Sequence, residues 1–213
     1  MDWKKEFIDF SFKKKALKFG TFKLKSGRSS PYFFNSGLLS TGKDIIKIGL
    51  FYAHSIIASK IKFDVLFGPA YKGIPIAVAT SIALQNYYNL NIPYAFNRKE
   101  SKKHGEQGDL IGEKIDNKKI IILDDVITSG TAIHHSIEII EKQRAQISSV
   151  FVLLDRKEKG KRNLCTINHL KNQKSYEIIS IITIEDLISY LLEDKTLKKH
   201  IPDLVQYRKK YGI

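Results

Sequence analysis

The sequence predicts an α/β fold in which a central, mostly parallel sheet is flanked by helices. Short apolar runs lie between turn residues, as expected of strands buried on both faces, at 63–68, 91–96, 119–125 and 147–155. Segments of helical character separate these runs, at 43–60, 74–87 and 131–144. Alternation of this kind implies right-handed crossovers, so we expect helices on both faces of the sheet.

The residues ahead of this core predict a helix and a pair of short strands. In the first twenty residues, Trp3, Phe7, Phe10 and Leu17 fall on roughly one side of an amphipathic helix. The segment "TFKLKSGRSSPYFFNSG" (21–37) then alternates in short pieces around a glycine and a proline, which is typical of a hairpin.

The C-terminal part predicts one more strand and a helix at 175–194 and a final helix at 196–211. The sequence contains no repeat, low-complexity linker or compositional break. We therefore expect a single domain over 1–213, with an accessory layer from about 1–40 folded onto a core at about 60–160.

The composition fits a cytoplasmic protein without a membrane partner. Hydrophobic residues make up 43% of the chain, and the single cysteine, Cys165, excludes an internal disulfide and a zinc site of several cysteines. The first residues lack the uninterrupted apolar core of a secretion signal. The longest window without charge, from Lys72 to Arg98, is interrupted well short of the roughly 20 apolar residues of a membrane span.

The net charge of +14 leaves two interpretations open. It could attract nucleic acid or a phosphate-rich small substrate. The lysines are scattered over the whole length, however, whereas a dedicated binding surface concentrates them on one face or helix. We favour the interpretation that the many lysines are a general feature of the composition, and we expect no nucleic-acid partner. Only the lysine clusters near 98–103 and 157–162 suggest a local function.

Polar stretches follow three successive predicted strands and can share one site. They are "GPAYKGIP", "NRKESKKHGEQGDLIGE" and "DDVITSGT". In open α/β sheets, ligands bind beyond the carboxyl ends of the strands, where loops enter the following helices.

"DDVITSGT" has the features of a phosphate cradle beside a sugar site. The hydroxyl residues and glycine of 128–131 lead into a helix, whose N-terminal N–H groups and dipole favour an anion. Asp124 and Asp125 can accept hydrogen bonds from two vicinal hydroxyls. The stretch is neither the nucleoside-triphosphate loop nor the dinucleotide glycine pattern. The alternative is that the two aspartates merely cap a helix.

The other two stretches suit a pyrophosphate. Gly68 and Gly73 permit close backbone approach or positive φ, and Lys72 supplies a charge, although a simple βα turn is the alternative. The polar run 98–113 is rich in cations and jointed by glycines. It could be a solvated surface loop; we favour a mobile lid, at about 97–112, that closes over a departing pyrophosphate.

These residues resemble a known family signature. "IILDDVITSG" is similar to the phosphoribosyl-diphosphate signature of the type I phosphoribosyltransferases. "LKSGRSSPYFFNSG", "RKESKKHGE" and "LLDR" narrow the resemblance to the orotate phosphoribosyltransferase family, over essentially the whole chain. It implies the type I phosphoribosyltransferase fold with an N-terminal hood. It also implies transfer of a phosphoribosyl group from 5-phospho-α-D-ribose 1-diphosphate (PRPP) to orotate in UMP biosynthesis.

The resemblance implies an orotate pocket formed by Lys25, Phe33, Phe34, Thr128 and Arg156. A guanidinium can bind the carboxylate of orotate with two hydrogen bonds, which suits Arg156. Two alternatives stay open: "YFF" as core packing, and an ion pair of Arg156 with Asp155 or Glu158.

For PRPP, the resemblance implies contacts from Lys25, Tyr71, Lys72, Arg98, Lys99, Lys102, His104, Asp124, Asp125, Val126, Ile127, Thr128, Ser129, Gly130, Thr131 and Ala132. Lys102 is the expected main catalytic cation, His104 a weaker candidate for hydrogen bonding or proton delivery, and Asp124 and Asp125 the acidic pair. Arg98 would reach the diphosphate of a neighbouring subunit in a homodimer. We expect Mg²⁺ to bridge the substrate's oxygens near the acidic pair rather than to occupy an all-protein site.

Two rival functions remain. One is a phosphoribosyltransferase for uracil or a purine, which would give no reason for Arg156 or for "KSGR…YFF". The other is a regulator that senses PRPP and binds nucleic acid, for which the region before the substrate segment is too short to hold an added winged-helix domain.

Overall fold

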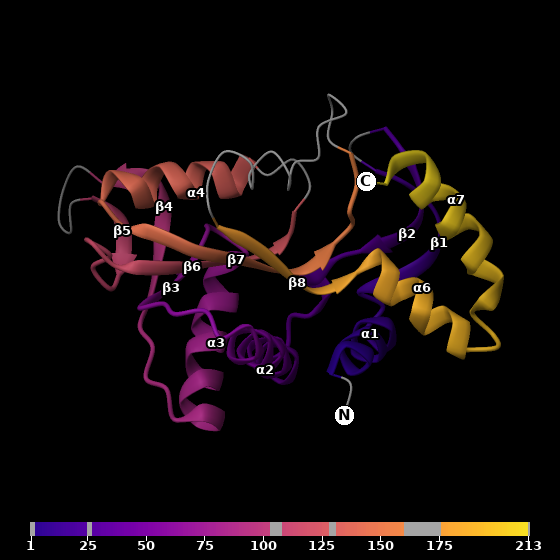
Figure 1. The fold of residues 1–213 in the computed structure, drawn as a ribbon, viewed down its shortest axis with the longest axis horizontal. Helices are drawn as coiled ribbons and strands as arrows, with labels where there is room; N and C mark the ends of the chain where they lie inside the picture. The colour runs from indigo at the N-terminus through magenta and orange to yellow at the C-terminus, as the bar shows by residue number, and fades with distance from the viewer. Residues whose placement is uncertain (1–2, 25–26, 103–107, 128–130, 160–175, 213) are drawn as a thin grey trace.

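The fold is a six-stranded sheet with helices on both faces and a smaller layer at one end (Figure 1). The computed structural model describes residues 3–24, 27–102, 108–127, 131–159 and 176–212. Its strands are β1 (Leu17–Lys23), β2 (Ser29–Phe34), β3 (Val65–Gly68), β4 (Tyr94–Lys102), β5 (Gly108–Gly112), β6 (Lys119–Val126), β7 (Gln146–Asp155) and β8 (Glu177–Thr183). Its helices are α1 (Trp3–Lys13), α2 (Gly42–Ser59), α3 (Gly73–Tyr88), α4 (Thr131–Lys142), α6 (Ile184–Glu193) and α7 (Ile201–Tyr211), with 3₁₀ turns η1 (Ser36–Leu38) and η2 (Lys198–His200).

The central sheet has the order β5-β4-β3-β6-β7-β8, and only the β4–β5 pair is antiparallel. All of β3 is buried, as is β6 from Ile120 to Asp124. Strands covered on both faces read as continuous apolar runs, which explains the pattern of the sequence. The predicted α/β class, with a mostly parallel sheet flanked by helices, is therefore confirmed. The parallel order brings the carboxyl ends of β3, β6 and β7 to one edge.

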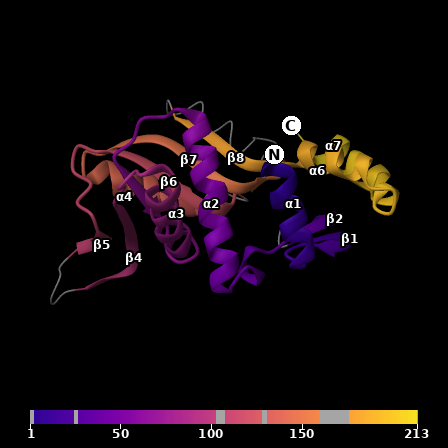
Figure 2. The same ribbon diagram turned by 90° about the horizontal axis from the view of Figure 1, so that it is seen from below.

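The alternation of side chains along β6 divides the interior into two apolar clusters. Ile121 and Leu123 face the cluster that includes α2 and α3, whereas Ile120 and Ile122 face the one that includes α4. In Figures 1 and 2, α2 and α3 lie together on one face of the sheet and α4 lies on the other. Of the described helices, none is both long and apolar enough to cross a membrane.

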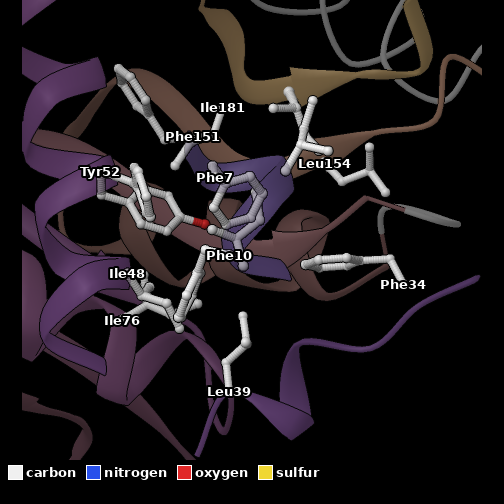
Figure 3. Close-up of a cluster of buried hydrophobic side chains, with 14 of the residues drawn as sticks. Phe7, Phe10, Phe34, Leu39, Ile48, Tyr52, Ile76, Phe151, Leu154 and Ile181 are labelled. Carbon is white, nitrogen blue, oxygen red and sulfur yellow. The ribbon is translucent and has the colours of Figure 1, made fainter. Parts of the chain in front are cut away.

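The terminal elements pack together at one end of the sheet (Figure 1). Phe7 of α1 joins this layer to the core, because its ring contacts Phe51 of α2 and Phe34 of β2 at centroid distances of 5.2 Å and 6.2 Å. Figure 3 places Phe7 and Phe34 with Tyr52 in the same cluster. The hairpin β1–β2 and helices α1, α6 and α7 thus share the apolar cluster that also covers one face of the sheet.

The local differences from the expected elements have physical reasons. Leu17 does not lie on the first helix: α1 ends at Lys13, and Leu17 begins β1 opposite Phe34. The second core strand begins at Tyr94, later than expected, and runs on to Lys102 into the segment predicted as a loop. Pairing with β5, which includes Lys102 opposite Gly108, supplies the backbone hydrogen bonds that the polar composition did not suggest.

Candidate active site

The turn between β3 and α3 approaches β6 so closely that only glycine fits. A Cβ atom on Gly68 would lie 2.3 Å from the carbonyl oxygen of Gly73, and one on Gly73 would lie 2.7 Å from that of Leu123. Close approach, rather than positive φ, is thus the use of both glycines. Ala70 and Tyr71 in this turn are joined by a cis peptide bond, and the Tyr71 side chain is exposed.

A buried asparagine on β4 fixes the same turn. The Asn97 side-chain oxygen accepts a hydrogen bond from the N–H of Ala70 (2.9 Å), and its amide nitrogen donates to the carbonyl of Arg98 (3.2 Å). The turn that carries Tyr71 and Lys72 is therefore held from β6 on one side and from β4 on the other. Asn97 was not predicted to support this turn, because it stands at the head of a polar stretch in which no motif singles it out.

Asp125, at the end of β6, is the centre of a small polar cluster. Its Oδ2 accepts hydrogen bonds from Lys72 Nζ (2.7 Å) and from Ser36 Oγ (2.6 Å), and Lys72 Nζ also lies 3.3 Å from Ser36 Oγ. Its Oδ1 accepts from the N–H of Val126 (2.9 Å). The cluster joins the turns after β3 and β6 to η1, as expected for residues at one edge of a parallel sheet. Ser36 was not predicted as a site residue.

Asp124 is more deeply placed, with an exposed fraction of only 9%. Its Oδ1 accepts from the N–H of Asp125 (2.8 Å), and its backbone carbonyl accepts from the hydroxyl of Tyr52 on α2 (2.6 Å). Burial first, and then the adjacent charge of Asp125, raise the pKa of the Asp124 carboxyl to about 6. A carboxyl with a pKa in this range at a strand end is typical of a ligand site.

The remaining residues of the predicted cradle are described only in part. Ile127 is buried, and α4 begins at Thr131 with Ala132 next. Thr128, Ser129 and Gly130 lie outside the described residues.

The first and last parts of the cationic stretch lie in two strands that pair with each other. Arg98, Lys99 and Lys102 belong to β4, which pairs with β5 as an antiparallel ribbon. His104 lies outside the described residues. The closing of this segment as a lid stays a prediction.

Side chains of the predicted base pocket lie on different faces of the hairpin β1–β2, which we call the hood hairpin. Phe34 is buried in the core cluster, whereas Phe33 has an exposed fraction of 38% and stacks on Phe22 with a centroid distance of 5.6 Å. Successive side chains of a strand point to opposite faces, which explains the split. Core packing, one of the two interpretations, therefore holds for Phe34. Lys25 lies outside the described residues.

Arg156 follows β7 directly and is nearly buried, with an exposed fraction of 8%. Its Nε donates to Glu158 Oε1 (2.6 Å), and its Nη2 donates to Ser30 Oγ of β2 (2.8 Å). The ion pair with Glu158, which the sequence left open as an alternative to the orotate contact, is thus present. The guanidinium lies where the hood hairpin and α7 approach the carboxyl end of β7.

Comparison with known proteins identifies the family. A family model of the phosphoribosyl transferase domain matches residues 39–164. Over 213 residues, the chain is 81% identical to orotate phosphoribosyltransferase of Buchnera aphidicola subsp. Acyrthosiphon pisum (strain Tuc7), with 100% of both chains covered. The chain belongs to the orotate phosphoribosyltransferase family.

More distant members of the orotate phosphoribosyltransferase family agree with this assignment. The enzyme of Pseudoalteromonas translucida (strain TAC 125) is 50% identical over 212 residues, covering 100% of this chain and 99% of its own. The crystal structure of orotate phosphoribosyltransferase from Francisella tularensis has a TM-score of 0.88 and 41% identity, covering 98% of this chain and 100% of that one. The resemblance inferred from the sequence motifs is therefore confirmed.

Proposed function

We propose that the chain transfers the 5-phosphoribosyl group from PRPP to N1 of orotate, giving orotidine 5′-monophosphate and diphosphate. The proposal rests on one observation above the others: Asp125, the second member of the acidic pair at the end of β6, accepts a hydrogen bond from Lys72 at the edge where the family binds its donor. The choice of orotate as the base is supported by full-length relatives of that name. The reaction belongs to de novo synthesis of UMP.

The reaction requires chiefly electrostatic stabilisation of its transition state. The bond between the anomeric carbon and the diphosphate oxygen breaks as N1 of orotate forms its bond to that carbon, and the proton that N1 carried is released in net with the diphosphate. Positive charge develops on the sugar and negative charge on the leaving group, so fixed cations and acceptors on opposite sides of the anomeric carbon lower the barrier.

On the sugar side, Asp124 and Asp125 are proposed to accept hydrogen bonds from the ribose hydroxyls. In the free chain, Asp125 is neutralised by Lys72 at 2.7 Å. Lys72 has an exposed side chain, so it can leave Asp125 and turn to the diphosphate when the donor binds. The hydroxyl residues of 128–131 and the start of α4 are proposed to receive the 5′-phosphate, together with the backbone of Val126, Ile127 and Ala132.

On the leaving-group side, we propose Tyr71, Lys99, Lys102 and His104 as the residues that close over the diphosphate. Lys102 is proposed as the main catalytic cation, and His104 as a hydrogen-bond or proton donor to the diphosphate. Lys99 and Lys102 belong to strand β4, and glycines follow them in the sequence, which suits a segment that excludes water from the site.

The donor set fits Mg²⁺ held jointly with the substrate. Asp124 and Asp125 offer carboxylate oxygens, which Mg²⁺ prefers, and the described part of the chain holds no cluster of three or more candidate metal-ligating side chains. Asp124 and Asp125 would hold the ion directly or through water. When bound, the ion would neutralise charge on the diphosphate and orient the ribose hydroxyls.

For the base, we propose that Arg156 binds the carboxylate of orotate, with Thr128, Lys25, Phe33 and the backbone of Phe34 around the ring. Arg156 is already nearly buried and hydrogen-bonded on two of its nitrogen atoms. A cation in this place separates orotate from uracil, which lacks the carboxylate.

We further propose a homodimer in the cytoplasm in which Arg98 reaches the diphosphate of the second subunit. Exposed apolar side chains support an interface: Ile46 on α2, and Ile82 and Tyr87 on α3, are each more than half exposed. Helices α2 and α3 lie together on one face of the sheet (Figure 2). The lone Cys165 is consistent with a reducing compartment.

The test is an ultraviolet assay of the purified chain with Mg²⁺ and PRPP, with orotate, uracil, hypoxanthine and adenine in parallel. We expect turnover confined to orotate. Turnover with another base would leave the donor site intact and overturn the pocket assignment. Silence with all four, together with salt-dependent binding of nucleic acid, would favour the regulator.

A further inference from the structure

The guanidinium of Arg156 is held on several sides by residues that were not predicted to contact the substrates. Besides the bonds to Glu158 and Ser30, its Cζ lies 4.1 Å from the centre of the Tyr32 ring. Ser30 Oγ in turn donates to the carbonyl of Tyr32 (2.7 Å), and both Ser30 and Tyr32 are buried. A planar cation fixed along two edges and over one face cannot turn freely.

Helix α7 supplies a further contact, through Tyr207. Its hydroxyl donates to Glu158 Oε1 (2.9 Å) and lies 3.5 Å from Arg156 Nη2. Burial first, and then the Glu158 carboxylate, raise the pKa of the Tyr207 hydroxyl, so it stays a proton donor at neutral pH. The end of α7 is tied to the same segment, because the N–H of Lys159 donates to the carbonyl of Tyr211 (2.8 Å).

One carboxylate serves two guanidinium groups in this cluster. Glu158 Oε1 accepts from Arg156, and Glu158 Oε2 accepts from Arg28 Nη1 at 3.1 Å. Arg28 is also fixed to the backbone, since its Nη2 donates to the carbonyl of Lys159 (2.7 Å). Two cations therefore share a single negative charge.

The charged groups around this cluster do not cancel the excess. Glu185 lies between two cations, Lys157 at 3.5 Å and Arg208 at 2.6 Å, and Asp155 adds one more carboxylate beside Arg156. With Arg28, Arg156 and Glu158, the groups are four cations and three carboxylates, a net charge of +1. Arg156, Glu158 and Arg28 are mostly buried, whereas Lys157, Glu185 and Arg208 are a third to a half exposed, so solvent screens the outer part of this charge.

We propose that Glu158 and Tyr207 are positioning residues that hold Arg156 ready for the carboxylate of the base, which makes helix α7 part of the base site. The proposal rests on the proposed function and deepens it. A free arginine side chain would lose rotamer freedom when it bound the substrate, whereas one already fixed by its neighbours loses little. The positioning should therefore act on the affinity for the carboxylated base and leave the donor site unchanged.

The test compares Tyr207→Phe and Glu158→Gln with a matched control, Tyr211→Phe. Tyr207→Phe removes only the hydroxyl, and Glu158→Gln keeps the shape while removing the charge. Tyr211 lies one turn further along α7. Its ring packs against Tyr207 and Arg28, contacts that phenylalanine keeps, and within the described residues its hydroxyl has no hydrogen-bond partner. Each variant and the unaltered chain are measured for the KM of orotate, the KM of PRPP, kcat and thermal unfolding.

For Tyr207→Phe we expect the KM of orotate to rise roughly three- to tenfold, the effect of one hydrogen bond, with the KM of PRPP within about twofold. Glu158→Gln should shift the KM of orotate in the same direction, and Tyr211→Phe should change neither constant. An equal rise of both KM values, or no change in either, would overturn the positioning role. If the unaltered chain did not turn over orotate, the proposed function itself would fail, and the positioning role with it.

Discussion

Gly73→Ala tests whether the close approach of the β3–α3 turn to β6 positions the donor site. Gly73 is the first residue of α3, and an added Cβ would lie 2.5 Å from Pro69 Cδ, 2.7 Å from the Leu123 carbonyl oxygen and 2.8 Å from the Gly68 carbonyl carbon. These atoms belong to the backbone or to a ring joined to it, so the turn itself must move. Overpacking of this kind costs about 1–3 kcal/mol of unfolding free energy.

The movement should also reduce catalysis. Leu123 directly precedes the acidic pair, and Lys72 directly precedes Gly73, so a shift of the turn changes the geometry between Lys72 and Asp125. Misplacement by about 1 Å can lower a rate on the order of 100-fold. We therefore expect a fall in kcat/KM for PRPP of roughly 10- to 100-fold in a chain that still folds.

Gly42→Ala is the matched control, because Gly42 is likewise the first residue of its helix, α2, and no atom lies within 4 Å of the added Cβ. There we expect unchanged activity and a stability equal to or slightly above that of the unaltered chain, by up to about 1 kcal/mol. Urea denaturation followed by circular dichroism and the orotate assay measure both variants. Equal stability and equal activity of Gly73→Ala and Gly42→Ala would show that the close approach of this turn to β6 does not position the donor site.

Three further predictions concern the acidic pair and the segment proposed to close over it. Tyr52→Phe leaves the buried carbonyl of Asp124 without its hydroxyl donor, so urea denaturation should give a loss of about 1–3 kcal/mol of unfolding free energy. Because the Asp124 pKa is raised to about 6, the folded chain holds the proton of this carboxyl more tightly than the unfolded chain. The contribution of Asp124 to the free energy of unfolding therefore falls as pH rises from about 4 to about 6. The value of kcat/KM for PRPP should fall below about pH 6, where Asp124 becomes protonated. Carbon-13 NMR titration should find the Asp124 pKa lowered in Asp125→Asn. An unshifted pKa would show that the charge of Asp125 does not raise it. Lys102→Ala should lower kcat by roughly 100- to 1,000-fold with little change in orotate affinity, and near-normal turnover would remove the role of the segment.

The central elements were predictable because their signals are local. The four apolar residues before Asp124 lie in a strand covered on both faces, and such a strand needs no alternation to be recognised. The polar residues that follow it sit at the ligand edge by the geometry of parallel sheets, which does not depend on detailed packing. Asp124, Asp125 and Lys72 could therefore be assigned to one edge before their contacts were known.

The parts that could not be predicted depend on partners distant in sequence. The polar residues of β4 from Arg98 to Lys102 have the composition of a loop, and only their pairing with β5 makes them a strand. Arg156 is fixed by Ser30 and Tyr207, which lie 126 and 51 residues away along the chain, so no local pattern announces them.

The role of Arg156 in choosing the base is tested most directly by calorimetry, which compares the equilibrium affinities of the chain for orotidine 5′-monophosphate and uridine 5′-monophosphate. The two nucleotides share the ribose, the 5′-phosphate and the ring, and differ in the carboxylate that Arg156 is proposed to bind. We expect the orotidine nucleotide to bind roughly 10- to 100-fold more tightly, as for a charged hydrogen-bond pair. Equal affinities would contradict the account, because they would leave the buried cation at the end of β7 without a part in choosing the base.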